Sequence, residues 1–151
     1  MTHVSSPRMP RRLLARMRYL ALAVTTIGLG LAVHWRVGAL SPVVRDIMGD
    51  ALWAAMVTWW VAAVAPAIRL RGRAALALTF CFAVEFSQLL RSPALDSLRR
   101  TPAGLLTLGS GFDPRDFVSY AIGVLAAILV DRATGRRRSG ERPGPPPRAV
   151  I

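Results

Sequence analysis

The sequence has little of what metal-dependent enzymes and disulfide-bonded proteins rely on. Its single cysteine, Cys81, excludes a disulfide within the chain. Its two histidines, His3 and His34, lie at opposite ends of an apolar run and cannot form a metal pair. It contains no CxxC, HExxH, GxSxG, Walker or dinucleotide-binding motif. The sequence therefore predicts no metal and no cofactor, and it does not predict an enzyme.

Acidic residues are also scarce. Eight of them stand against twenty basic residues, all arginine, which gives a net charge of +12. A nucleic-acid-binding domain would explain the charge, but it would not carry the long uncharged runs of a chain that is 53% hydrophobic. A membrane protein with basic tails explains both properties. Nucleic acid is therefore not a predicted partner.

Four windows with little or no charge predict four transmembrane helices, because a spanning helix needs about 20 apolar residues. Asp113-Pro114 is typical of a helix start, with Asp113 as N-cap, and it lengthens the last window. The predicted fold class is all-α, a polytopic four-transmembrane-helix bundle. The spans are about 19–35, 51–68, 74–90 and 114–131, between a basic tail (1–18) and a disordered Arg/Pro-rich tail (132–151).

Small residues recur along three of these spans and predict close helix packing. The stripes are Ala21, Thr25, Gly28 and Ala32 in the first span, Ala51, Ala55, Thr58, Ala62 and Ala65 in the second, and Ser119, Gly123 and Ala127 in the fourth.

The arginines set the orientation, since cytoplasmic segments of membrane proteins are enriched in basic residues. Both tails and the second connection carry fourteen of the twenty, and the other two connections carry six. We therefore expect a multi-pass membrane protein with both termini in the cytoplasm. On the opposite side, Ser92-Pro93 predicts a short interfacial helix between helices 3 and 4, and Ser41-Pro42 predicts a helical turn before Gly49-Asp50.

Polar residues gather at the outer ends of three spans. Glu85 lies within the third span, and Gln88 and Cys81 share its helix face. An intramembrane carboxylate usually faces the bundle interior with a partner, for which Arg91, Arg99 and Arg100 are candidates. The predicted ligand-binding residues are Asp50, Glu85, Gln88, Arg91, Asp116 and Tyr120.

Each of these residues has a structural alternative. Asp50 and Asp116 open the second and fourth spans in this prediction, so they are also candidates for helix caps. Glu85 with Gln88 could join helices, bind a ligand or take part in catalysis. Cys81 is expected to be a small apolar filler.

Several segments together resemble a known family. They are Gly49-Asp50-Ala51-Leu52-Trp53-Ala54, Glu85-Phe86-Ser87-Gln88, Leu95 through Arg99, Leu108-Gly109-Ser110-Gly111-Phe112, and Asp116, Tyr120 and Gly123. This pattern resembles the small bacterial membrane proteins of the domain-of-unknown-function 2809 family, from about Arg16 to Asp131. That family is similar in outline to VanZ-like proteins, which also pair an intramembrane Glu-x-x-Gln with a later Asp and Gly.

The chain departs from these patterns at two positions. Ser110 stands where the family often has His, and Tyr120 stands where VanZ-like proteins tend to have Asn. The resemblance implies a polytopic inner-membrane protein with a cell-envelope connection, and it implies no particular reaction.

Three functional hypotheses follow. In the first, the outer polar cluster binds a lipid or a cell-envelope precursor head group, with nearby arginines suited to a phosphate. In the second, the chain is a structural subunit or assembly factor of a membrane complex. In the third, it is a membrane-embedded enzyme with Glu85 or Asp116 as general base. The expected partners are membrane lipids, with a homo-oligomer or a membrane-protein partner as alternatives.

Overall fold

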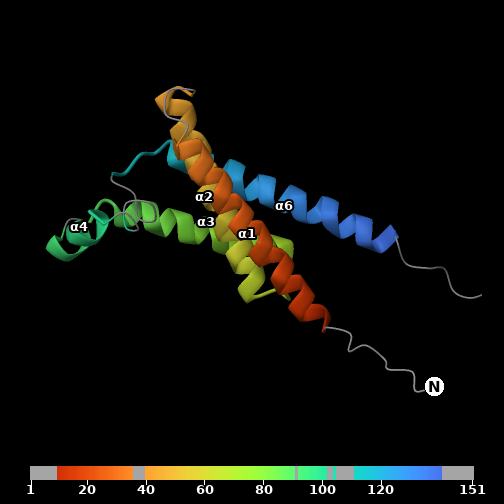
Figure 1. The fold of residues 1–151 in the computed structure, drawn as a ribbon. Coiled ribbons are helices and arrows are strands. Elements are labelled where there is room, and N and C mark those ends of the chain that lie inside the picture. Colours follow the sequence, from red (N-terminus) through yellow and green to blue (C-terminus); the bar gives the residue numbers. More distant parts are fainter. Residues whose placement is uncertain (1–9, 36–39, 91, 102–103, 105–110, 141–151) are drawn as a thin grey trace, which may run out of the picture.

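The computed structural model of the protein describes residues 10–35, 40–90, 92–101, 104 and 111–140. In this part of the chain the protein is all-helical, as predicted. The helices are α1 (Arg11–Trp35), α2 (Pro42–Val64), α3 (Leu70–Ser87), α4 (Pro93–Arg99) and α6 (Asp116–Gly140) (Figure 1).

Three of the helices are long and apolar enough to cross a membrane. They are α1, α2 and the first 19 residues of α6. The predicted third span, 74–90, corresponds to α3, which has 18 residues and carries Arg71 and Arg73 in its first turn. It does not meet the same criterion, so the membrane character is confirmed and the count of four spans is not.

The start of α2 differs most from the prediction. Ser41 is its N-cap, with Oγ accepting from the Val44 amide at 3.4 Å, and Pro42 occupies the first turn. The predicted short turn and the second span are therefore one helix, and charged side chains at Arg45 and Asp46 do not interrupt it. Asp50 accordingly lies within α2 and does not cap it, which corrects that prediction.

The bounds of the other long helices also differ from the predicted ones. α1 begins at Arg11 instead of residue 19, because the arginine-, leucine- and alanine-rich segment after Pro10 favours helix. α2 ends at Val64 instead of residue 68, because Pro66 offers no amide hydrogen and disfavours helix at the residue before it. α6 continues to Gly140, past the tail boundary expected at Arg132, and residues 141–151 lie outside the described part of the chain.

α6 begins two residues later than the predicted start at residue 114. Asp113 caps a turn that precedes the helix, since its Oδ1 accepts from the Arg115 amide at 2.9 Å. The helix itself starts at Asp116. The short helix predicted after Ser92-Pro93 is present as α4, capped by the Ser92 hydroxyl, which accepts from the Leu95 amide at 3.2 Å. Its position at a membrane surface stays a prediction.

The bundle is organised around α2, which contacts α1, α3 and α6. In Figure 1 α1 begins and α6 ends on the same side of the molecule. The small residues of the predicted second and fourth stripes lie in these contacts; Thr58, Ala62, Ser119 and Ala127 are almost completely buried. α6 comes close to the α2 backbone at Gly123, where an added Cβ would lie 2.0 Å from the Ala51 carbonyl oxygen.

The small-residue stripe predicted for the first span is wrong. Ala21, Thr25, Gly28 and Ala32 are exposed, whereas α1 packs against the bundle through Tyr19, Ala23 and Thr26. Spacing alone indicates that residues share a helix face, but not which face turns inward. Here the Tyr19 ring selects the face, because it stacks on Trp59 of α2 with ring centroids 6.2 Å apart.

Gly123→Ala should destabilise the protein by about 1–3 kcal/mol, because the new methyl group must push α6 away from the α2 backbone. Gly28→Ala is the matched control, since nothing lies within 4 Å of the added Cβ. The free energy of unfolding in mild detergent checks both variants. Equal stability of the two would contradict the close contact between α2 and α6.

Candidate functional site

Glu85 is the most deeply buried ionisable residue of the predicted cluster, with none of its surface exposed. Its Oε1 accepts from the Asp113 amide at 2.7 Å, and its Oε2 accepts from Gln88 Nε2 at 3.1 Å and from the Tyr120 hydroxyl at 3.0 Å. These donors come from α3, from the segment before α6, and from α6. Glu85 therefore joins three parts of the chain, and the structure brings three predicted site residues into direct contact.

An aromatic cluster packs beside Glu85 at the junction of α3 and α6. Phe82 and Phe117 meet edge to face with centroids 4.7 Å apart, and Phe86 contacts both Phe112 and Phe117. Cys81 is completely buried one helical turn before Glu85 and packs as the predicted apolar filler. Because Glu85 is completely buried, the three hydrogen bonds that it accepts are the contacts that make its burial tolerable.

Among the described residues Glu85 pairs with no arginine, which corrects the expectation for Arg99 and Arg100. Arg99 is buried and turns back on α3, where Nη1 donates to the Leu90 carbonyl at 3.0 Å and Nη2 donates to the Ser87 carbonyl at 2.7 Å. It thus satisfies carbonyl groups that the end of α3 leaves free. Arg100 is exposed, and Arg91 lies outside the described residues.

Asp50 and Asp116 form a pair of carboxyl groups near Glu85. Both carboxyl groups line one cavity and lie near enough to influence each other, although Asp50 comes from the third turn of α2 and Asp116 from the start of α6. Two neighbouring negative charges repel, and a proton or another cation between them relieves that repulsion. The pair is therefore suited to a positively charged or proton-donating group.

A cavity of about 760 Å³ opens beside this carboxyl pair. Its walls come from the second half of α1, the first half of α2, the end of α3 and the beginning of α6, and they are largely apolar. Asp50, Gln88, Asp116 and Tyr120 line it, whereas Glu85 stands behind Gln88 and Tyr120 and does not. The other polar lining residues are Thr26, His34, Arg45, Asp46 and Asp113. The cavity has the size of an ordinary small-molecule site.

Gln88, which lines this cavity, carries a buried hydrogen-bond acceptor without a partner. The residue is 7% exposed, and its Oε1 has no partner among the described residues. The NH₂ group of Gln88 is turned toward Glu85, which leaves Oε1 as the unused end of the amide. A buried acceptor without a donor is costly, so the cavity favours a ligand that supplies an N–H or O–H group.

The opposite end of the bundle holds a polar cluster that the sequence reasoning did not predict. Arg73 Nη1 donates to Asp131 Oδ2 at 2.8 Å and to the Tyr19 hydroxyl at 2.7 Å, and the Tyr19 hydroxyl donates to Asp131. Arg18 also pairs with Asp131. Arg73 further donates to the carbonyls of Pro66 and Ile68 in the α2–α3 connection.

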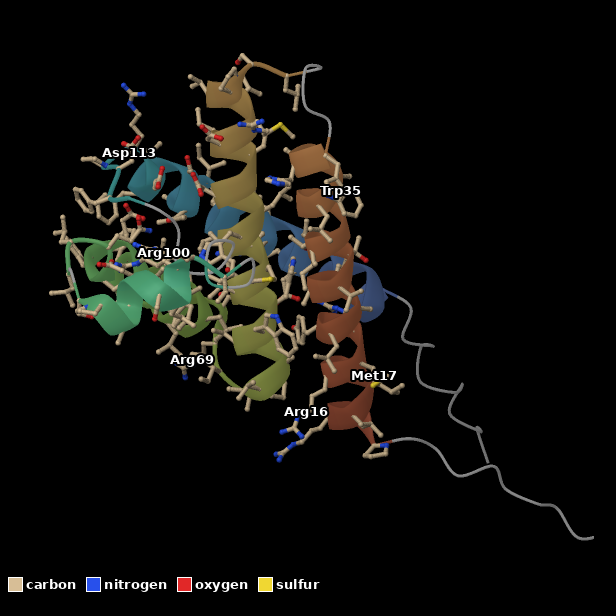
Figure 2. All side chains as sticks on the ribbon, turned by 60° about the vertical axis from the view of Figure 1, so that its left-hand side comes forward. Arg16, Met17, Trp35, Arg69, Arg100 and Asp113 are labelled. Carbon is tan, nitrogen blue, oxygen red and sulfur yellow. The ribbon has the colours of Figure 1, made fainter. Side chains whose placement is uncertain are left out.

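This cluster ties α1, α3 and α6 together at the end away from the cavity. Figure 2 shows Trp35 and Asp113 toward one end of the molecule and Arg16 and Arg69 toward the other. The sequence carries one signal for the cluster: Asp131 is an acid within a strongly basic stretch, at the inner end of a span. Arg18 and Arg73 were read as orientation signals only, and the reach of their side chains toward Asp131 was missed.

Asp131→Asn should destabilise the protein by about 3–5 kcal/mol, because it leaves two buried or half-buried arginines without their anionic partner. Asp96→Asn is the control, since its 3.5 Å pair with Arg99 is more exposed and should contribute less than about 1 kcal/mol. Denaturant unfolding in detergent compares the two variants. A loss at Asp131 no larger than at Asp96 would mean that the cluster does not hold the helices together.

Within the described residues, no group of three or more His, Cys, Asp or Glu side chains is arranged to hold a metal ion. No solved structure matches the chain. Residues 39–124 match the model of a protein family described as a protein of unknown function, DUF2809. This segment contains Asp50, Glu85, Gln88, Asp116 and Tyr120, together with Gly123. The match covers more than half of the chain, and the protein therefore belongs to the DUF2809 family.

Proposed function

We propose that the protein crosses the bacterial plasma membrane four times, with α3 as the additional span and both termini in the cytoplasm. Contacts at the two ends of α3 support this topology. Arg73 near its start pairs with Asp131, and Glu85 near its end accepts from Tyr120. Twelve residues separate the two positions in α3 and eleven separate them in α6, so both helices traverse the same depth.

The surface of α3 is also suited to lipid. Leu76, Phe80 and Phe86 are each about half exposed, as are Ile122, Leu125 and Leu129 on α6. Exposed apolar rows of this kind would be unfavourable in water and are ordinary in a bilayer. With α3 as a span, the cavity lies at the outer end of the bundle and the Arg73–Asp131 cluster at the cytoplasmic end.

For the function, we propose that the outer cavity binds the head group of a lipid or of a cell-envelope precursor. The observation that carries this proposal is the buried, unpartnered Gln88 Oε1 beside the Asp50–Asp116 pair. The polar end of the cavity offers acceptors, and its apolar walls, which include Ile27, Leu52 and Met56, suit the chain of an amphiphile. An N–H or O–H group of the ligand would donate to Gln88.

The charge of the cavity favours an amine- or hydroxyl-bearing head group over a phosphate. Four aspartates line it, and Arg45 is the one arginine among the described lining residues. Two of the arginines considered for a phosphate do not line it: Arg99 is engaged by carbonyls at the end of α3 and Arg100 is exposed. An ammonium group would relieve the repulsion between Asp50 and Asp116 without leaving a buried charge unpaired.

Glu85 itself supports a second, structural function. All of its contacts are internal and it does not line the cavity, so its role in the fold is to join helices. A subunit or assembly factor of a membrane complex would need the same bundle without a ligand in the cavity. The two candidates differ in what accompanies the purified protein.

Native mass spectrometry of the protein released from mild detergent should detect a bound small amphiphile. Asp50→Asn keeps the shape of the side chain but removes the charge, and it should reduce the occupied fraction by about tenfold because charge-assisted hydrogen bonds are the strong ones. Asp96→Asn, outside the cavity, should leave occupancy unchanged. The mass of the ligand distinguishes an amine from a metal ion. A protein subunit in place of any small ligand would favour the assembly function.

The topology gives a separate prediction in intact cells, tested in a Cys81→Ala background. A cysteine at the exposed position Ser97 in α4 should react with a membrane-impermeant thiol reagent, and a cysteine at Ser5 or Ser139 should not. If only α1, α2 and α6 cross the membrane, the pattern changes: Ser97→Cys is protected and Ser139→Cys reacts. That result would overturn the four-span proposal.

A further inference from the structure

A second, shallower cavity of about 560 Å³ lies at the end of the bundle that holds the Arg73–Asp131 cluster. Four arginines line it: Arg18 from α1, Arg69 from the α2–α3 connection, Arg73 from α3 and Arg132 from α6. Asp131 is the one acidic residue among its described lining residues. Segments far apart in the sequence therefore bring four positive charges and one negative charge to a single hollow.

Asp131 cannot balance these charges. It already accepts from Arg18, from Arg73 and from the Tyr19 hydroxyl, which uses both of its oxygens. Arg69 and Arg132 are exposed and form no ion pair within the described part of the chain. Arg18 Nε is buried and has no hydrogen-bond partner there. The hollow thus keeps an excess of positive charge and several free N–H groups.

The backbone adds donors at the same place. α3 begins at Leu70, and its N-cap Arg69 makes no side-chain hydrogen bond to the first amides of the helix. The amides at the start of a helix have no acceptor within the helix and carry a partial positive charge, which favours anions. Because Arg69 and Leu70 both line the hollow, the uncapped end of α3 opens toward the arginines.

From these observations we propose that this hollow binds the phosphate of an anionic lipid head group, with Arg69 and Arg132 as its principal ligands. The proposal is independent of a ligand in the outer cavity and rests only on the membrane placement of the bundle. The hollow lies at the cytoplasmic end of three apolar helices, at the level where head groups meet the protein. Arginine is suited to this role because its planar fork of donors matches the oxygens of a phosphate. Anionic lipids of the cytoplasmic leaflet attract such basic clusters.

Arg73 and Arg18 have a different part in this arrangement. Their pairing with Asp131 and Tyr19 fixes the floor of the hollow and holds α1, α3 and α6 in register. Arg69 and Arg132 lie at its rim, where replacement leaves these internal contacts intact. The proposed binding can therefore be removed without dismantling the fold.

The test uses the full-length protein in nanodiscs of phosphatidylcholine with increasing fractions of phosphatidylglycerol. Phosphatidylglycerol should raise the melting temperature of the wild type and should remain bound in native mass spectrometry. In the double variant Arg69→Gln/Arg132→Gln, the fraction of protein that keeps phosphatidylglycerol bound should fall at least about tenfold. Its melting temperature in pure phosphatidylcholine should equal that of the wild type.

Arg71→Gln is the matched control. Arg71 is an exposed arginine in the first turn of α3, two residues after Arg69, and it does not line the hollow. It should retain phosphatidylglycerol within about twofold of the wild type, as should Asp50→Asn at the outer cavity. An equal loss in Arg71→Gln would show nonspecific attraction and overturn the proposal. Stabilisation by inorganic phosphate alone, without preference for phosphatidylglycerol, would overturn the assignment of a lipid.

Discussion

The complete burial of Glu85 is the constraint on which the candidate site depends. A carboxyl group removed from water must be given donors, and here they are the Asp113 amide, the Gln88 side chain and the Tyr120 hydroxyl. These contacts hold the segment before α6 against the end of α3. They also engage the NH₂ group of Gln88 and leave its oxygen without a partner at a residue that lines the cavity. Glu85 is thus a positioning residue, and the groups that can meet a ligand are Asp50, Gln88 and Asp116.

The bundle is chemically different at its two ends. The outer cavity is dominated by carboxyl groups, and the opposite hollow is dominated by arginines around Asp131. Each end also locks α3 to α6, through Glu85 and Tyr120 at one end and through Arg73 and Asp131 at the other. A helix bundle in lipid gains little from apolar burial, so polar contacts of this kind and the close approach at Gly123 hold it together.

The sequence contains enough to predict the all-helical class, the apolar spans and much of the site. Helical spacing puts Gln88 beside Glu85, and the ends of the apolar runs put Asp50, Asp116 and Tyr120 at one depth. Their convergence could not be derived, because it depends on helix rotation, which the Gly123–Ala51 contact and the Tyr19–Trp59 stack determine. The small-residue stripe of α1 shows the same limit. The spacing of its residues indicates that they share a helix face, but not that this face is exposed.

Two other features were beyond pattern reasoning. Sequence periodicity does not indicate which group a long side chain contacts. The hydrogen bonds from Arg99 to carbonyls at the end of α3 were therefore not predicted. The pairing of Arg18 and Arg73 with Asp131 was not predicted either. The N-cap at Ser41 extends α2 through charged residues that looked like a connection. In each case a single hydrogen-bonding group overrides the composition of the segment around it.

The central claim is that the outer cavity binds a group that donates to Gln88. An experimental structure of the full-length protein in nanodiscs made from its native membrane lipids tests it most directly. The account predicts density for an amine- or hydroxyl-bearing group about 3 Å from Gln88 Oε1 and next to the Asp50–Asp116 pair. A cavity closed by the protein's own side chains, with Gln88 Oε1 accepting from one of them, would contradict it.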